Sequence, residues 1–170
     1  LIGPWAHKYP HFAKPGPAIG FLQECLRWWD YWLKGIETGV MAEPQLRAWV
    51  QEYVPPAPYH EEFPGTWVAE ESWPPDSIGT QDFYLSPEGL ADTPVAQSEI
   101  QFSSPQDTGT YGGRWCAFGL EPDGPGDQRG EEGGSLIFEG DPLSQDLVCL
   151  GAPEVDLVVS SDQPVANLIA

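Results

Sequence analysis

The stretch QLRAWVQE, residues 45–52, alternates its apolar side chains with other residues. Leu46, Ala48 and Val50 occupy every second position of this stretch. Because successive side chains of a strand point to opposite faces, a period of two predicts a half-buried β-strand. The sequence before this strand has a different period, so we place the main domain boundary near residue 45.

Downstream of residue 52 the sequence predicts more short strands, separated by Gly and Pro. The predicted strands span residues 66–69, 81–85, 99–102, 114–118, 135–139, 146–150 and 155–160. Many short strands without a helix between them are typical of a β-sandwich or jelly roll. Pro55, Pro56 and Pro58 end the first strand and predict a rigid, exposed connector between separate units. The expected fold class for residues 46–170 is therefore mainly β.

Upstream of the boundary, residues 19–34 have the periodicity of an amphipathic helix. The apolar residues that recur at intervals of three and four are Phe21, Leu22, Cys25, Leu26, Trp28, Trp29, Trp32 and Leu33. Lys34 and Gly35 supply the cation and the flexible residue expected where a helix ends. We expect Trp28, Trp29 and Trp32 to pack this helix against a sheet.

Composition and charge exclude several classes of function. Lys and Arg number 7 against 26 Asp and Glu, which gives a formal net charge of −19. Such a charge repels nucleic acids and anionic membranes, and no apolar run reaches the roughly 18 residues that span a bilayer. Cys25, Cys116 and Cys149 lack the spacing of a zinc site or a disulfide framework. We therefore expect no metal and no cofactor.

Several short motifs occur in a fixed order along the chain. They are Gly3-Pro4-Trp5-Ala6-His7, residues 26–35 (LRWWDYWLKG), Gly65-Thr66-Trp67, residues 71–74 (ESWP), Asp127-Gln128-Arg129 and residues 135–138 (SLIF). Their order and content resemble the cocaine esterase and X-prolyl dipeptidyl peptidase family of serine hydrolases. The first motif is similar to that family's G-P-W-x-H segment, and the second to its R-W-F-D-x-W-L-K-G helix.

The resemblance implies a domain organisation and a chemistry. Residues 1–45 would be the C-terminal end of an α/β-hydrolase domain, and residues 46–170 a galactose-binding-like jelly roll that is truncated at its end. His7 would be the triad histidine, which accepts the serine proton and returns it to the leaving group. Trp5 would stand at the wall of the substrate pocket. No G-x-S-x-G nucleophile motif occurs in the chain, so the chain alone is expected to be inactive and to be a piece of a longer protein.

Other residues leave alternatives open. His11 and His60 match no motif, and surface placement is expected for both. The carboxylates that could bind Ca²⁺ are Glu121, Asp123, Asp127, Glu131 and Glu132, but their spacing does not match a calcium loop. A local ion pair between Asp127 and Arg129 is favoured instead.

Function has an alternative too. Trp67 and Trp73 could form a sugar-stacking platform in a carbohydrate- or ligand-binding module without catalysis, although a core between the two domains is favoured for them. Under the hydrolase hypothesis the partner is a small ester or amide, or a short peptide. A homo-oligomer and the cellular compartment are left open, with the cytoplasm favoured.

Overall fold

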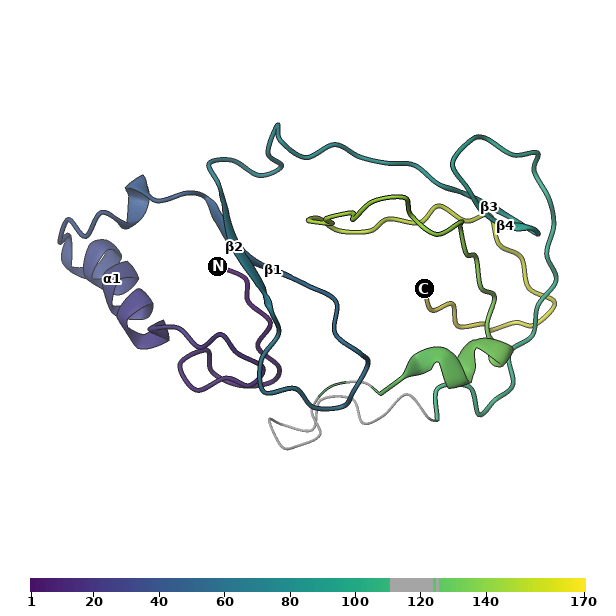
Figure 1. Ribbon diagram of the computed structural model, residues 1–170, viewed down its shortest axis with the longest axis horizontal. Helices are drawn as coiled ribbons and strands as arrows, with labels where there is room; N and C mark the ends of the chain where they lie inside the picture. The colour runs from purple at the N-terminus through teal and green to yellow at the C-terminus, as the bar shows by residue number, and fades with distance from the viewer. Residues whose placement is uncertain (111–123, 125) are drawn as a thin grey trace.

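The structure of the chain, a computed structural model, describes residues 1–110, 124 and 126–170. Its elements in chain order are α1 (Phe21–Lys34), η1 (Val40–Ala42), β1 (Leu46–Gln51), β2 (Gly65–Glu70), β3 (Tyr84–Ser86), β4 (Gly89–Ala91) and η2 (Gln128–Gly134). The strands form two antiparallel pairs, β1 with β2 and β3 with β4. In Figure 1, α1 lies at one end of the molecule, the β3–β4 pair lies at the other, and the β1–β2 pair lies between them.

The strand predicted over residues 45–52 is confirmed as β1. It pairs with β2 in a register that runs from Leu46 opposite Glu70 to Gln51 opposite Gly65. Leu46 and Ala48 are buried, which agrees with the alternation in the sequence. The proline-rich stretch lies in the connection between these two paired strands, so the prediction that it links separate units is wrong. Proline removes backbone donors only locally, and the chain returns to pair with β1 after it.

The N-terminal segment is attached to the other edge of β1. The Ile2 amide donates to the Arg47 carbonyl at 2.8 Å, and the Trp49 amide donates to the Ile2 carbonyl at 2.9 Å. These two hydrogen bonds form a parallel bridge between Ile2 and Ala48. The segment that carries the GPWAH motif therefore leaves directly from the edge of the β1–β2 sheet.

Helix α1 agrees with the sequence prediction except at its first turn. It begins at Phe21, because Gly20 has a non-helical ψ of 58° and acts as the N-cap. It ends at Gly35 in the left-handed region, where the Gly35 amide donates to Tyr31 and the Ile36 amide donates to Asp30. Among the described residues, no helix is both long and apolar enough to cross a bilayer.

The apolar face of α1 is uncovered. Trp28, Trp29 and Trp32 are 45%, 52% and 53% exposed, and no residue of the helix is buried. The expected packing of these tryptophans against a sheet is therefore not formed within the described part of the chain, whose strands lie elsewhere (Figure 1). An apolar face of this width is typical of a surface that another protein element covers.

Several predicted strands are not formed. The prediction for residues 81–85 is confirmed only in part, by β3, and residues 114–118 lie outside the described residues. Residues 99–102, 135–139, 146–150 and 155–160 run without a strand ladder (Figure 1). The apolar pattern marks which residues favour an extended backbone, but a strand also needs a partner in register. Where residue 139 meets β4, the contact is a single hydrogen bond from the Leu90 amide to the Glu139 carbonyl at 2.9 Å.

Candidate functional site

His7 is exposed on a tight turn just outside the sheet. The Lys8 amide donates to the Ala6 carbonyl at 2.7 Å, so His7 is the central residue of a three-residue turn. Pro4, three residues earlier, is buried, whereas the His7 side chain is exposed. The turn therefore leaves the His7 side chain accessible to solvent.

Trp5 holds the start of this loop against the sheet. Its indole Nε1–H donates to the Pro17 carbonyl at 2.7 Å, which joins the two ends of the loop that contains His7. Its ring centroid lies 6.3 Å from that of Trp67 on β2. The indole also folds back over Gly3, where an added Cβ would lie 2.5 Å from two ring atoms. A glycine at position 3 is thus the residue that leaves room for Trp5.

Trp5, Trp49 and Trp67 form a continuous tryptophan cluster. Trp49 and Trp67 are cross-strand partners on β1 and β2, with centroids 5.4 Å apart and planes at 65°. Trp49 Nε1 donates to the Phe63 carbonyl at 3.1 Å. Trp67 contacts Trp5, but Trp67 and Trp73 are 36% and 46% exposed, so the core predicted for them between the two domains is not formed within the described residues. The alternation of apolar residues over residues 45–52 did not single out Trp49 as a member of this cluster. The only feature of the sequence that indicated a close contact here was Gly65, two residues before Trp67.

A second cluster, which we call the charge cluster, joins α1 to β1 and consists of Glu24, Arg27, Glu43 and Arg47. Arg47 Nη2 lies 3.0 Å from Glu24 Oε2 and 3.1 Å from Glu43 Oε2. Arg27 pairs with Glu43 and, at 3.4 Å, with Glu24. All four side chains are half-buried. The cluster could not be predicted from the sequence, because its members lie in α1, just after η1 and in β1, and each looks like an ordinary polar position.

The charge cluster makes the attachment of α1 dependent on pH. The hydrogen bond from Arg27 holds the pKa of Glu43 below its usual value of 4.5. Because the folded-state pKa is lowered, the stabilisation is present above the ordinary pKa and is lost as the pH falls through the lowered one. We expect Glu43→Gln to lower the melting temperature by about 3 °C at pH 7, and this difference to shrink as the pH is lowered below 4.5. Thermal melts followed by circular dichroism measure both values.

Glu52→Gln is the matched control for this prediction. Glu52 is exposed and lies just past the end of β1, so its substitution removes the same charge outside the cluster. A loss of stability that is equal in both variants, or that does not shrink at low pH, would show that the effect is one of net charge and not of the cluster.

The other two histidines, His11 and His60, each lie against aromatic side chains. The His11 ring stacks on Phe21 with centroids 6.0 Å apart and an interplanar angle of 1°, and it meets Phe12 edge-on at 4.3 Å. The His60 ring lies 4.9 Å from that of Phe63. His11 is exposed, as expected, and lies within the His7 loop, whereas His60 is half-buried in the connection between β1 and β2.

The ion pair predicted between Asp127 and Arg129 is confirmed. Arg129 Nε lies 2.9 Å from Asp127 Oδ1, and the Arg129 amide donates to the same oxygen at 3.0 Å. These hydrogen bonds lower the pKa of Asp127 to about 2. Glu131 accepts a hydrogen bond from the Gly109 amide at 2.9 Å. Glu121 and Asp123 lie outside the described residues, and the described ones contain no group of three side chains that could hold a metal ion.

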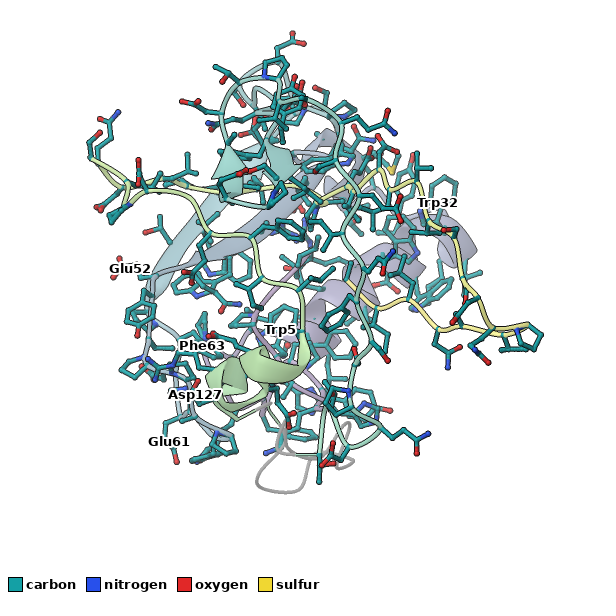
Figure 2. The ribbon with its side chains drawn as sticks, turned by 90° about the vertical axis from the view of Figure 1, so that its right-hand side faces the viewer. Trp5, Trp32, Glu52, Glu61, Phe63 and Asp127 are labelled. Atoms are coloured by element: carbon teal, nitrogen blue, oxygen red, sulfur yellow. The ribbon has the colours of Figure 1, made fainter. Side chains whose placement is uncertain are left out.

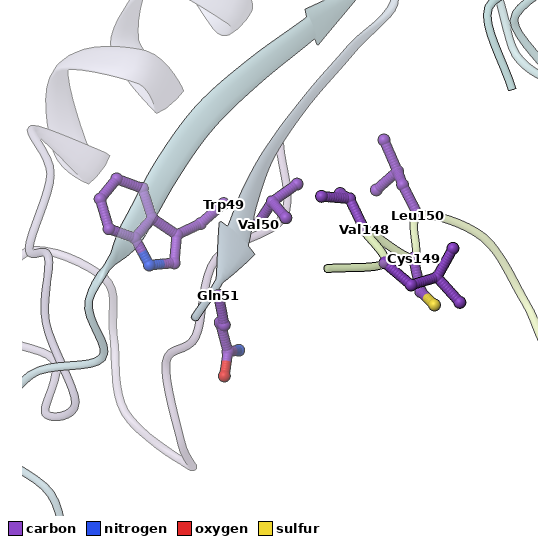
Figure 3. A pocket seen from close by; sticks show the side chains of 7 residues that line it. Trp49, Val50, Gln51, Val148, Cys149 and Leu150 are labelled. Atoms are coloured by element: carbon purple, nitrogen blue, oxygen red, sulfur yellow. The ribbon is translucent and has the colours of Figure 1, made fainter. Parts of the chain in front are cut away.

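A shallow pocket opens between β1 and the C-terminal segment (Figure 3). It is lined by Trp49, Val50, Gln51 and residues 147–150. Figure 3 shows no charged side chain among the labelled ones, and Cys149 is the only nucleophilic group in the lining. The lining lacks an acid or base, so it offers no hydrolytic chemistry, and His7 is not part of it.

The candidate residues lie in different parts of the molecule, and the His7 loop is held by contacts at both of its ends. Figure 2 shows Trp5 toward the middle of the molecule, with Glu61 and Trp32 farther out. Lys14 Nζ lies 2.6 Å from Glu61 Oε2, and the Gly16 amide donates to the Glu61 carbonyl at 2.8 Å. The His7 loop is therefore tied to the β part at both ends. The roles of His7 in catalysis and of Trp5 in a substrate pocket stay predictions.

Comparison with known protein families gives a match over most of the chain. The family model described as the X-Pro dipeptidyl-peptidase C-terminal non-catalytic domain matches residues 38–170. Neither the curated proteins nor the solved structures give a match to the chain. The matched domain is a β-sandwich, and the described strands all pair antiparallel, so the mainly β class is confirmed. Trp49, Trp67 and Arg47 lie within the match, whereas His7, Trp5 and α1 precede it.

Proposed function

Because the chain belongs to the family of X-Pro dipeptidyl-peptidase C-terminal non-catalytic domains, we propose that it is part of a serine hydrolase and supplies the histidine of its catalytic triad. The hydrolase cleaves ester or amide bonds, those after an X-Pro dipeptide included. The residue that performs this role is His7. The observation that carries the proposal is the exposed position of His7, in a GPWAH motif, at the edge of the matched domain's first sheet.

In the proposed reaction His7 carries out both proton transfers. The imidazole of His7 takes the proton from a serine Oγ as that oxygen attacks the substrate carbonyl, and then gives it to the leaving group. An imidazole suits both steps because its unperturbed pKa of about 6.5 is close to neutral pH. The serine and the acidic residue come from the catalytic domain of the same longer protein, since this chain has no G-x-S-x-G motif.

The uncovered face of α1 supports the same assignment. Its exposed apolar side chains include Leu26, Trp29 and Leu33. In an α/β-hydrolase a helix of this kind packs on the central sheet, and burial of three large apolar side chains contributes several kcal/mol. We propose that the catalytic domain covers this face, while the charge cluster holds the other side of α1 to β1.

A fluorophosphonate serine probe tests the proposal. The longer protein, with its complete catalytic domain, should be labelled covalently, and its labelling should be blocked by prior heat denaturation. The 170-residue chain alone should stay unlabelled, because it has no activated serine. Intact mass spectrometry counts the adducts on each. An adduct on the chain alone, or none on the longer protein, would contradict the assignment.

The alternative predicted from the sequence, a carbohydrate- or ligand-binding module, depends on exposed tryptophans. Trp67 has aromatic neighbours in Trp5 and Trp49, so its ring is engaged within the tryptophan cluster. Trp73 is exposed, and its backbone amide donates to Gln45 Oε1 at 3.1 Å. No observation on the described residues favours the module over the hydrolase.

A further inference from the structure

The tryptophan cluster connects the non-catalytic domain to the segment that carries His7. We propose that Trp67 is a positioning residue for His7 and acts through Trp5. This inference rests on the proposed function, because it concerns the position of His7 as the triad histidine. Trp67, a residue of the matched domain, would thereby influence the geometry of the triad through Trp5.

Trp5 is the step between the domain and the histidine. It lies two residues before His7, and its indole is held on one side by the Pro17 carbonyl at 2.7 Å and on the other by the ring of Trp67. Trp5 is three residues after Ile2, and the backbone of Ile2 forms a bridge to β1. Position and direction of the chain are therefore both fixed just before the turn at His7.

Trp67 is itself held in place by its neighbours on the sheet. It faces Trp49 across the β1–β2 ladder, and Trp49 is fixed by its hydrogen bond to the Phe63 carbonyl. Gly65 leaves space for the Trp49 indole, since a Cβ there would lie 2.8 Å from Trp49 Nε1. The surface that Trp5 contacts is thus held by interactions within the β1–β2 pair and its connection.

The far end of the loop is anchored to the same domain. The Gly16 amide donates to the Glu61 carbonyl at 2.8 Å, and the Phe63 amide donates to the Gly16 carbonyl at 3.2 Å. The Phe63 carbonyl also accepts from Trp49 Nε1, so Phe63 joins the far end of the loop to the tryptophan cluster. Loss of Trp67 would leave this second anchor intact and would remove the aromatic contact that holds Trp5 at the end next to His7.

The consequence for catalysis is specific. A base displaced by about 1 Å from its productive position can lower the rate about a hundredfold without changing substrate binding. Loosening of Trp5 should therefore lower kcat of the hydrolase more than it changes KM. A residue that only stabilised the fold would change neither constant for the molecules that remain folded.

Limited trypsin digestion of the 170-residue chain tests the inference without any catalytic readout. Cleavage after Lys8 reports on the His7 turn, and cleavage after Arg129, 75% exposed in η2, reports on a distant site. Trp67→Ala should raise the ratio of the Lys8 rate to the Arg129 rate about fivefold, as expected for loss of one aromatic contact. Trp67→Phe should restore the wild-type ratio, because it keeps a ring against Trp5.

Trp73→Ala is the matched control, because it removes an exposed tryptophan of the same domain that lies outside the cluster. Its ratio should equal that of the wild type. An unchanged ratio in Trp67→Ala, or equal acceleration at both sites, would overturn the inference. Neither outcome bears on the fluorophosphonate test, so failure of the positioning role and failure of the hydrolase assignment can be told apart.

Discussion

His7→Ala, introduced into the longer protein with its catalytic domain, should lower kcat/KM by about 10⁴-fold to 10⁶-fold. Without an imidazole the serine hydroxyl has no base to take its proton, and the leaving group has no acid. KM should change little, because His7 acts on the reacting atoms and not on the rest of the substrate. Hydrolysis of a p-nitrophenyl ester and of an X-Pro p-nitroanilide, each followed by absorbance, measures the loss for both bond types.

His11→Ala and His60→Ala are the controls for this prediction. Both remove an imidazole from the same part of the protein, but each ring lies against an aromatic side chain and outside the GPWAH motif. We expect their kcat/KM values to stay within about threefold of the wild type, in line with loss of an aromatic contact. If His7→Ala kept a tenth of the activity while His11→Ala lost it, the triad histidine would have been assigned to the wrong residue.

Local features of the fold could be predicted from the sequence. Helix α1 and strand β1 were recognised because each has its own periodicity, and Gly35 marked the end of the helix correctly. The ion pair of Asp127 with Arg129 joins residues two apart, so it too is a local feature. Each of these depends on a few neighbouring residues.

Features that join distant parts of the chain could not be predicted. The bridge from Ile2 to Ala48 and the contact from Trp5 to Trp67 close long loops, and the apolar pattern carries no information on such partners. The strands expected over residues 146–150 and 155–160 failed for the same reason, since their extended backbones find no ladder. His7 itself was singled out by resemblance to a known motif, because its local pattern is that of any histidine in a Gly- and Pro-rich loop.

Gly65, the first residue of β2, lies against the backbone of Val50 and the indole of Trp49 on β1. A Cβ on Gly65 would lie 2.3 Å from the Val50 carbonyl oxygen and 2.8 Å from Trp49 Nε1. The first contact is with backbone, which cannot move without opening the β1–β2 ladder, where Gly65 pairs with Gln51. Gly65→Ala should therefore lower the free energy of unfolding by about 3 kcal/mol, which corresponds to a fall of about 10 °C in melting temperature.

Two measurements on Gly65→Ala separate this explanation from a general loss of glycine. Gly79→Ala is the control, because nothing lies within 4 Å of its added Cβ, and its melting temperature should stay within about 1 °C of the wild type. The circular dichroism band from coupled indoles should weaken in Gly65→Ala, since Trp49 and Trp67, now 5.4 Å apart, must separate when the ladder opens. A variant that melted like the wild type with an unchanged band would mean that Gly65 is not in contact with Trp49, and the surface proposed to hold Trp5 and His7 would lose its foundation.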